Sequence, residues 1–467
     1  MKREKKLLES TIVLFIGNII PRLVQFLLLP ILTTSLTKSD YGLYELVATL
    51  LSCLIPLAIL QMNSAAFRYL LDVKEEEKKK TIISSIVYII YTVVICISFL
   101  SLVVVSLLQK RSYAIIIFYF LSESILTIEK DVIRGLQKTK LYSLVGIFQS
   151  ICNLVLIIAV FHIGNGTIVE LFFALSLASW MAIVIGLLVS KMWRYISFAH
   201  VDLREFKEML LYAVPMIPNG LSHWIVDASD RLIVSVFLGL SSNGIYSAAS
   251  KIPAMLNLFQ TTFVNAWQEN ASIYLNDKDS EAYFTNTFRR IFSIFTAIVL
   301  MLIACVPVLF LVLLGPGYDQ AYNHIIILIV GVFFNILSSV IGGLYVAMKK
   351  SKEIGVSTVV AAIINMVINI VLVNFIGLYA ASLSTMLSYF VLFVYRIRDI
   401  RKHVSIKFDY RFIIFNILFL IGVSALSLVR NVVLNIVIGL VAIIYSIFLN
   451  LEIIKKVLIQ ISLKFKS

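Results

Sequence analysis

The sequence has little charge and little of the side-chain chemistry that catalysis uses. Only 14% of its 467 residues are charged, whereas soluble globular domains contain about a quarter. Its four cysteines lie in apolar runs without a CxxC pair, so no disulfide and no metal site is indicated. The five histidines are scattered, and there is no phosphate-binding Gly-x4-Gly-Lys-Ser/Thr motif. We therefore expect neither an enzyme nor a cofactor.

Long apolar runs are abundant instead. Hydrophobic residues make up 60% of the chain, and the mean hydropathy is +0.97. A hydrocarbon core about 30 Å thick is crossed by a helix of about 20 apolar residues. The sequence thus predicts an all-α polytopic membrane protein with about 14 transmembrane helices. The expected spans are 10–35, 42–65, 81–108, 113–129, 141–162, 167–190, 209–238, 243–268, 290–314, 322–347, 354–375, 378–395, 412–429 and 432–453.

The basic residues are distributed unevenly between the loops. If the N-terminus is cytoplasmic and each span crosses once, 33 of the 40 Lys and Arg residues fall on the cytoplasmic side and four outside. This asymmetry follows the positive-inside rule and predicts that both termini are cytoplasmic. The net charge of +14 therefore indicates contact with anionic membrane lipids rather than nucleic acid. We expect a multi-pass protein of a bacterial plasma membrane.

An internal repeat divides the chain. The segment SDYGLY at 39–44 recurs 202 residues later as SSNGIY at 241–246, with serine, glycine and tyrosine in register. We expect the glycine in a tight turn and the tyrosine ring at the membrane interface. Chance similarity between two apolar hairpins is the alternative. Six expected spans separate the copies, so both run in the same direction, as in transporters with parallel repeats and alternating access.

The repeat predicts two pseudo-symmetric six-helix lobes and two additional C-terminal helices. The N-terminal lobe covers residues 1–190, and a cytoplasmic interfacial linker covers 191–208. The C-terminal lobe covers 209–400. Residues 401–467 hold the two extra helices and a basic cytoplasmic tail.

Three basic residues fall deep within the expected spans. A charged side chain near the bilayer centre costs at least about 2.5–3.5 kcal/mol on insertion scales, so each is a functional candidate. We expect these cations to bind an anionic substrate, with arginine as a bidentate clamp for phosphate. The candidates are Arg22, Arg231 and Lys251.

Three acidic residues lie at similar depth and provide the competing interpretation. Asp227 and Arg231 are four residues apart on one helical face, where they can form an ion pair. The acids therefore serve either as structural counter-ions or as carriers of a coupling ion. The candidates are Glu123, Asp227 and Asp230.

Two hairpins carry a family resemblance. The segment 11–51, TIVLFIGNIIPRLVQFLLLPILTTSLTKSDYGLYELVATLL, and the segment 230–256, DRLIVSVFLGLSSNGIYSAASKIPAML, resemble lipid-linked oligosaccharide flippases of the polysaccharide-transporter family. The resemblance implies the multidrug and lipid-linked polysaccharide exporter superfamily, with a MATE-like fold and a central cationic cavity. Arg22, Arg231 and Lys251 are the positions that match the cavity cations.

The same resemblance implies a function. Such flippases move undecaprenyl-diphosphate-linked oligosaccharide repeat units from the cytoplasmic to the outer leaflet for surface polysaccharide biosynthesis, by alternating access. The implied partners are the polyprenyl-diphosphate-linked glycan, membrane lipids, H+ or Na+, and glycan-assembly proteins. The main alternative is a MATE-type drug/cation antiporter, whose cavity should be acidic. Two further alternatives are less favoured. A sugar polymerase or ligase needs a large outer loop, which the expected spans do not leave. A non-transporting scaffold would leave the intramembrane charges unexplained.

Overall fold

The computed structural model describes residues 2–109, 113–275, 277–452 and 455. Side chains are described within these ranges except at residues 2–12, 219–220, 222–223, 225–227, 258, 262 and 351. The described chain is helical and contains no β-strand. It divides into two compact units, Met1–Ser229 and Asp230–Ser467. Each unit is described below by itself.

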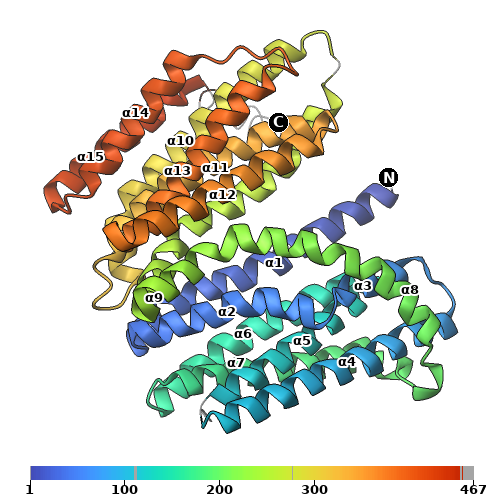
Figure 1. Cartoon of the computed structure of the whole chain (residues 1–467). Helices are drawn as coiled ribbons and strands as arrows, with labels where there is room; N and C mark the ends of the chain where they lie inside the picture. The colour runs from blue at the N-terminus through green and yellow to red at the C-terminus, as the bar shows by residue number, and fades with distance from the viewer. Residues whose placement is uncertain (1, 110–112, 276, 453–454, 456–467) are drawn as a thin grey trace, which may run out of the picture. The chain divides into compact units, whose positions relative to one another are not determined.

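Unit 1 is a bundle of long helices (Figure 1). Its helices are α1 (Lys2–Ser35), α2 (Lys38–Ala58), α3 (Met62–Asp72), α4 (Glu76–Leu107), α5 (Ala114–Gly135), α6 (Thr139–Ile163), α7 (Ile168–Ser190) and α8 (Leu203–Ala213), with short 3-10 turns at Met192–Tyr195, Phe198–His200 and Val214–Met216. The boundary between the units lies within α9 (Ile217–Ile273).

Unit 2 continues from α9 through six further helices. They are α10 (Ser280–Leu313), α11 (Ala321–Ala347), α12 (Ser351–Ile376), α13 (Tyr379–Ile400), α14 (Tyr410–Ser427) and α15 (Val432–Leu449). Helix α13 packs against both α11 and α12, while α14 and α15 lie beside α10 (Figure 1). The two last helices therefore pack against α10, and α14 also contacts α11.

Twelve helices among the described residues are long and apolar enough to cross a membrane. The all-α polytopic fold is thus confirmed, and the predicted number of 14 spans is approximate. Helix α9 contains the expected span 243–268 and most of the expected span 209–238. Helix α5 was expected to span but carries five charged residues, so it is less apolar than the twelve. The expected span 42–65 is divided between α2 and α3.

The turn predicted in the repeated motif was wrong. Residues 39–44 lie inside α2, whose first turn is capped by Thr37: the Thr37 hydroxyl oxygen accepts a hydrogen bond of 3.1 Å from the backbone N–H of Asp40. Residues 241–246 are also helical, and the break in α9 lies before them at Gly239, where φ is 83° and ψ is 171°. The first copy therefore follows a helix start capped by threonine, and the second copy follows a helix break at a glycine outside the motif.

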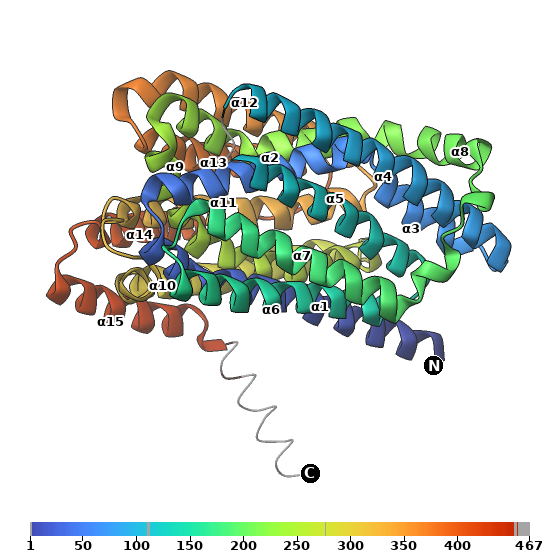
Figure 2. The same cartoon turned by 90° about the horizontal axis from the view of Figure 1, so that it is seen from below.

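Helices α5, α6 and α7 pack around an apolar core in unit 1. Helix α1 lies alongside α6 on another side of this group (Figure 2). The core keeps one face of α5 in contact with α6 and α7 and leaves other residues of α5 to face a polar space. Its fully or largely buried members are Ile125, Leu126, Ile133, Val145, Ala182 and Ile183.

Candidate functional site

A polar cavity of about 350 Å³ lies within unit 1. It is lined by α1, α2, α5, α6 and α7, which are brought together by the packing described above. Three of the lining side chains that the structure describes are charged, namely Arg22, Glu123 and Lys130. Because charge is costly in hydrocarbon, a membrane bundle keeps such side chains only where they face water, polar protein or a ligand. The cavity is therefore the candidate site of unit 1.

Helix α1 presents a polar face to this cavity. Asn18, Arg22 and Gln25 are spaced four and three residues apart, which places them on one side of the helix. Gly17 precedes them at a close approach of α1 to α6, because a Cβ atom there would lie 2.5 Å from the hydroxyl oxygen of Ser143. This contact fixes α1 one turn before Arg22 and so directs the arginine into the cavity.

Glu123 is held by neutral partners rather than by a cation. Its Oε1 atom accepts a hydrogen bond of 2.7 Å from the Gln149 side-chain amide and another from the Ser179 hydroxyl. Neither Glu123 nor Arg22 forms an ion pair with any residue that the structure describes. The competing interpretation, in which Glu123 neutralises Arg22 in a salt bridge, therefore does not hold for this geometry.

The second cation of the cavity is Lys130, seven residues after Glu123 on α5. Its ammonium nitrogen lies 5.6 Å from the centre of the Tyr142 ring, within the range of a cation–π interaction. Like Arg22, it has no hydrogen bond or ion pair to the described part of the chain. The charged lining thus carries two positive groups and one negative group, and the positive groups have unused donors.

Unit 2 contains a separate polar cluster around Asp230. Its Oδ2 atom accepts hydrogen bonds from the hydroxyls of Tyr246 at 2.9 Å and Thr385 at 2.6 Å, and Oδ1 accepts one from the Asn369 amide at 2.9 Å. The Oδ1 atoms of Asn365 and Asn369 are buried without a hydrogen-bond donor among the described residues. Asp230 is thus a carboxylate held by neutral hydroxyl and amide donors.

The other predicted site residues lie on α9. Arg231 and Lys251 are both half-buried, on opposite sides of the break at Gly239, and both belong to unit 2. Each has interactions with the rest of the chain. The side chain of Asp227 lies outside the described residues. Arg22 and Glu123 are therefore the two predicted residues that the structure brings to one cavity.

The tyrosines of the repeat also face polar groups. Tyr44 lines the cavity of unit 1, and Tyr246 is 5% exposed and donates to Asp230. The expectation that these rings lie at the membrane interface stays a prediction. The Tyr246 hydroxyl has its hydrogen-bond partner inside unit 2, as buried tyrosine hydroxyls generally do.

A sequence model of the family described as "Polysaccharide biosynthesis protein" matches residues 7–267, more than half of the chain. The chain belongs to the polysaccharide biosynthesis protein family. No curated protein matches this family member. The resemblance read from the two hairpins to polysaccharide transporters is confirmed.

Solved structures show the fold of this family member independently. "Lipid II flippase MurJ, inward closed conformation" aligns with a TM-score of 0.67 and 17% identity, covering 96% of this chain and 100% of that one. An inward-facing MATE multidrug resistance transporter of the MOP superfamily aligns with a TM-score of 0.64 and 15% identity, covering 83% and 98%. A MOP superfamily transporter from Pyrococcus furiosus aligns at 0.51 and 14%, covering 84% and 95%. The MATE-like fold is thus confirmed.

Sequence analysis of this polysaccharide biosynthesis protein missed several lining residues. Lys130 was counted among the cytoplasmic basic residues, although it is two helical turns from Glu123 and so shares its face. On α6, the cavity is lined by Tyr142, Gln149 and Asn153, which recur at helical spacing. The signal that identifies them is a polar stripe on an otherwise apolar helix, as on α1.

Proposed function

We propose that the protein is a flippase for undecaprenyl-diphosphate-linked oligosaccharide repeat units, which it moves from the cytoplasmic to the outer leaflet of a bacterial plasma membrane. The observation that carries the proposal is the cavity of unit 1, where Arg22 and Lys130 form no salt bridge with any residue that the structure describes. Family membership supports a role in polysaccharide biosynthesis, and the fold supports transport.

A diphosphate suits these two cations. The planar guanidinium of Arg22 can donate two parallel hydrogen bonds to phosphate oxygens, and the Lys130 ammonium acts as a compact positive charge. Gln25, Asn18 and Asn153 add polar groups to the lining for the sugar head. The polyprenyl tail can stay in lipid throughout, so the protein needs to shield only the polar part of the substrate.

The outward direction is consistent with simple electrostatics. A membrane potential is worth about 2.3 kcal/mol per unit charge per 100 mV, so an anion leaves a negative interior downhill. Ion exchange can add to this force. Asp230 is the preferred carrier of H+ or Na+ in this proposal, because its carboxylate is surrounded by neutral hydroxyl and amide groups. Glu123, bonded inside the cavity, is the second candidate.

The proposal keeps the topology that the basic loops predict, with both termini cytoplasmic. It also keeps the domain scheme read from the repeat, an N-terminal lobe at 1–190, a linker at 191–208, a C-terminal lobe at 209–400 and extra helices at 401–467. Arg231 and Lys251 remain proposed contributors to substrate binding from the C-terminal lobe, and Asp227 a proposed counter-ion. Glycan-assembly proteins are proposed partners.

The deciding experiment compares lipid-linked repeat units in a strain that lacks this gene and any related flippase. We expect the units to accumulate on the inner leaflet and to reach the outer leaflet again when the wild-type gene is restored. The Arg22→Ala variant should fail to restore delivery at equal protein level. Arg68→Ala is the matched control, because Arg68 is an exposed arginine of unit 1 paired with Asp72. Undiminished delivery in the deletion strain contradicts the proposal.

A drug/cation antiporter remains the second candidate, because Glu123 lines the same cavity and MATE transporters share the fold. The two proposals differ in the sign of the ligand. Proteoliposomes containing the purified protein distinguish them: the flippase binds polyprenyl diphosphate and the antiporter binds organic cations. Two cations against one acid in the charged lining favour the flippase.

A further inference from the structure

A second pocket lies in unit 1, at the turn between α5 and α6. Its volume is about 610 Å³, within the range of about 300–1,000 Å³ that is usual for ligand pockets. One side is apolar and is formed by α1 and α3, with Val13, Leu14 and Leu71. The other side is basic, with no acidic residue among the lining residues that the structure describes; its cations are Arg134, Lys138 and Lys140.

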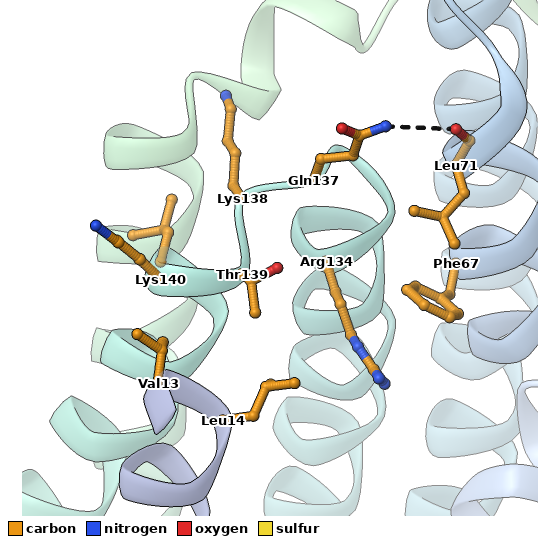
Figure 3. A pocket seen from close by; sticks show the side chains of 10 residues that line it. Val13, Leu14, Phe67, Leu71, Arg134, Gln137, Lys138, Thr139 and Lys140 are labelled. Atoms are coloured by element: carbon orange, nitrogen blue, oxygen red, sulfur yellow. Dashed lines mark hydrogen bonds between the residues drawn. The ribbon is translucent and has the colours of Figure 1, made fainter. Parts of the chain in front are cut away.

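Arg134 is the central cation of this basic pocket. Its guanidinium carbon lies 4.3 Å from the centre of the Phe67 ring, and Figure 3 shows the side chain extending between α5 and the helix that carries Phe67. Within the described chain, Arg134 has no hydrogen bond or ion pair. Asp131 lies near enough for its charge to interact with Arg134, but it accepts its hydrogen bond from Asn63 and does not line the pocket.

The other basic side chains surround the turn. Figure 3 shows Lys138 and Lys140 extending away from Arg134, with Thr139 between them. The Lys138 ammonium donates a hydrogen bond of 2.6 Å to the Ser190 carbonyl oxygen, so it is held in place by α7. Gln137 donates to the Leu71 carbonyl oxygen across the pocket. Lys140 is exposed and contributes a mobile positive charge rather than a fixed contact.

The pocket and the cavity are lined by neighbouring residues of the same helices. Arg134 belongs to the pocket and Lys130, one helical turn away, belongs to the cavity. Both cations lie 5.6 Å from the centre of the same ring, that of Tyr142. Helix α1 also lines both spaces, with Leu14 in the pocket and Gly17 in the cavity. A phosphate held at Arg134 therefore has its next cation about one helical turn away.

We propose that the basic pocket is a loading subsite, which binds the diphosphate of the polyprenyl-linked substrate before it passes to Arg22 and Lys130. The proposal rests on the flippase function proposed above. Arg134 is the phosphate clamp, oriented by Phe67, and Lys138 and Lys140 attract the anion. The apolar side contacts the first isoprene units. A negatively charged amphiphile fits this pairing of a basic and an apolar side, whereas a cationic drug does not.

Photocrosslinking tests the subsite without requiring transport. A benzophenone amino acid replaces Leu71 in the purified full-length protein, and radiolabelled farnesyl diphosphate serves as the probe. We expect capture at position 71 that falls about tenfold or more in Arg134→Ala, because the loss of charge-assisted hydrogen bonds to phosphate costs that much affinity. Arg134→Lys should keep an intermediate level of capture.

Two further variants guard against a folding defect in Arg134→Ala. Lys140→Ala changes an exposed side chain of the pocket and should lower capture a few-fold, as expected for one lost charge near a dianion. Lys207→Ala changes an exposed lysine of α8 outside the pocket and should have no effect. Capture that is insensitive to both Arg134→Ala and Lys140→Ala overturns the proposal. So does equal competition by phosphatidylglycerol, because the pocket then takes ordinary anionic lipid.

Transport kinetics separate failure of the subsite from failure of the proposed function. Arg134→Ala should slow flipping at low substrate concentration and approach the wild-type rate at saturation, whereas Arg22→Ala should slow it at every concentration. If the wild-type protein flips the substrate and Arg134→Ala matches it throughout, the subsite is wrong and the function stands. If the wild-type protein flips no polyprenyl diphosphate, the function itself is wrong.

Discussion

Replacing Glu123 by glutamine isolates the contribution of its charge. The Glu123 Oε1 atom accepts hydrogen bonds from Gln149 and Ser179, and a glutamine side chain keeps an oxygen in that place. The variant therefore preserves the local hydrogen bonds while the charged lining changes from two cations and one acid to two cations alone. We expect Glu123→Gln to bind a diphosphate more tightly than the wild-type protein.

The size of this effect follows from the spacing along α5. Glu123 and Lys130 are seven residues apart, so a phosphate held at Lys130 lies about 10 Å from the carboxylate. At an effective dielectric constant near 20, two unit charges at that distance interact by about 1.6 kcal/mol. Removing the repulsion should therefore raise the affinity roughly tenfold for each unit charge that the ligand carries near the site.

Calorimetric titration of the purified protein with inorganic pyrophosphate measures this affinity. Glu208→Gln is the matched control, because Glu208 is exposed on α8 and its charge is screened by salt. Glu123→Ala, which leaves Gln149 and Ser179 without their acceptor, should instead lose about 1–3 kcal/mol of stability. Unchanged or weaker binding by Glu123→Gln would refute the electrostatic account of the cavity.

Three further predictions concern other buried groups. Arg396→Ala should lower the free energy of unfolding, measured by thermal unfolding, by about 3–5 kcal/mol, because this residue is 4% exposed and its guanidinium joins α13 to α11 and α12. Arg398 is exposed on the same helix, so Arg398→Ala should change the free energy of unfolding by less than about 0.5 kcal/mol. Gly186→Ala should lower the melting temperature, since its Cβ would lie 2.2 Å from Glu129 Oε1, and Glu129→Ala in the same chain should restore it. Asp230→Asn should abolish any dependence of transport on Na+ or pH; an unaltered ion dependence excludes Asp230 as the carrier.

The fold was largely predictable because lipid imposes a strict length and composition on each span. Arg22 was predictable for a related reason. An arginine in the middle of an apolar span raises the free energy of membrane insertion, so it marks a candidate functional residue. Lys130 was not predictable in the same way. It lies near the end of α5 among other charged residues, where a cytoplasmic loop was an equally good interpretation.

The partners of the predicted acids could not be read from the sequence. Asp230 meets Asn369 and Thr385, which are 139 and 155 residues away along the chain. Likewise, Glu123 meets Ser179 on another helix, 56 residues later. Such pairings depend on how helices pack, and helical spacing within one segment carries no information about them. The sequence could therefore suggest that these acids matter without indicating that neutral groups hold them.

The composition of α5 has a consequence for biogenesis. A segment with Glu123 near its middle partitions poorly into lipid as an isolated helix, because a single acid there costs about 2.5–3.5 kcal/mol. The hydrogen bonds from Gln149 on α6 and Ser179 on α7 become available only after those later helices have been synthesised. We therefore expect stable integration of α5 to depend on the synthesis of α6 and α7.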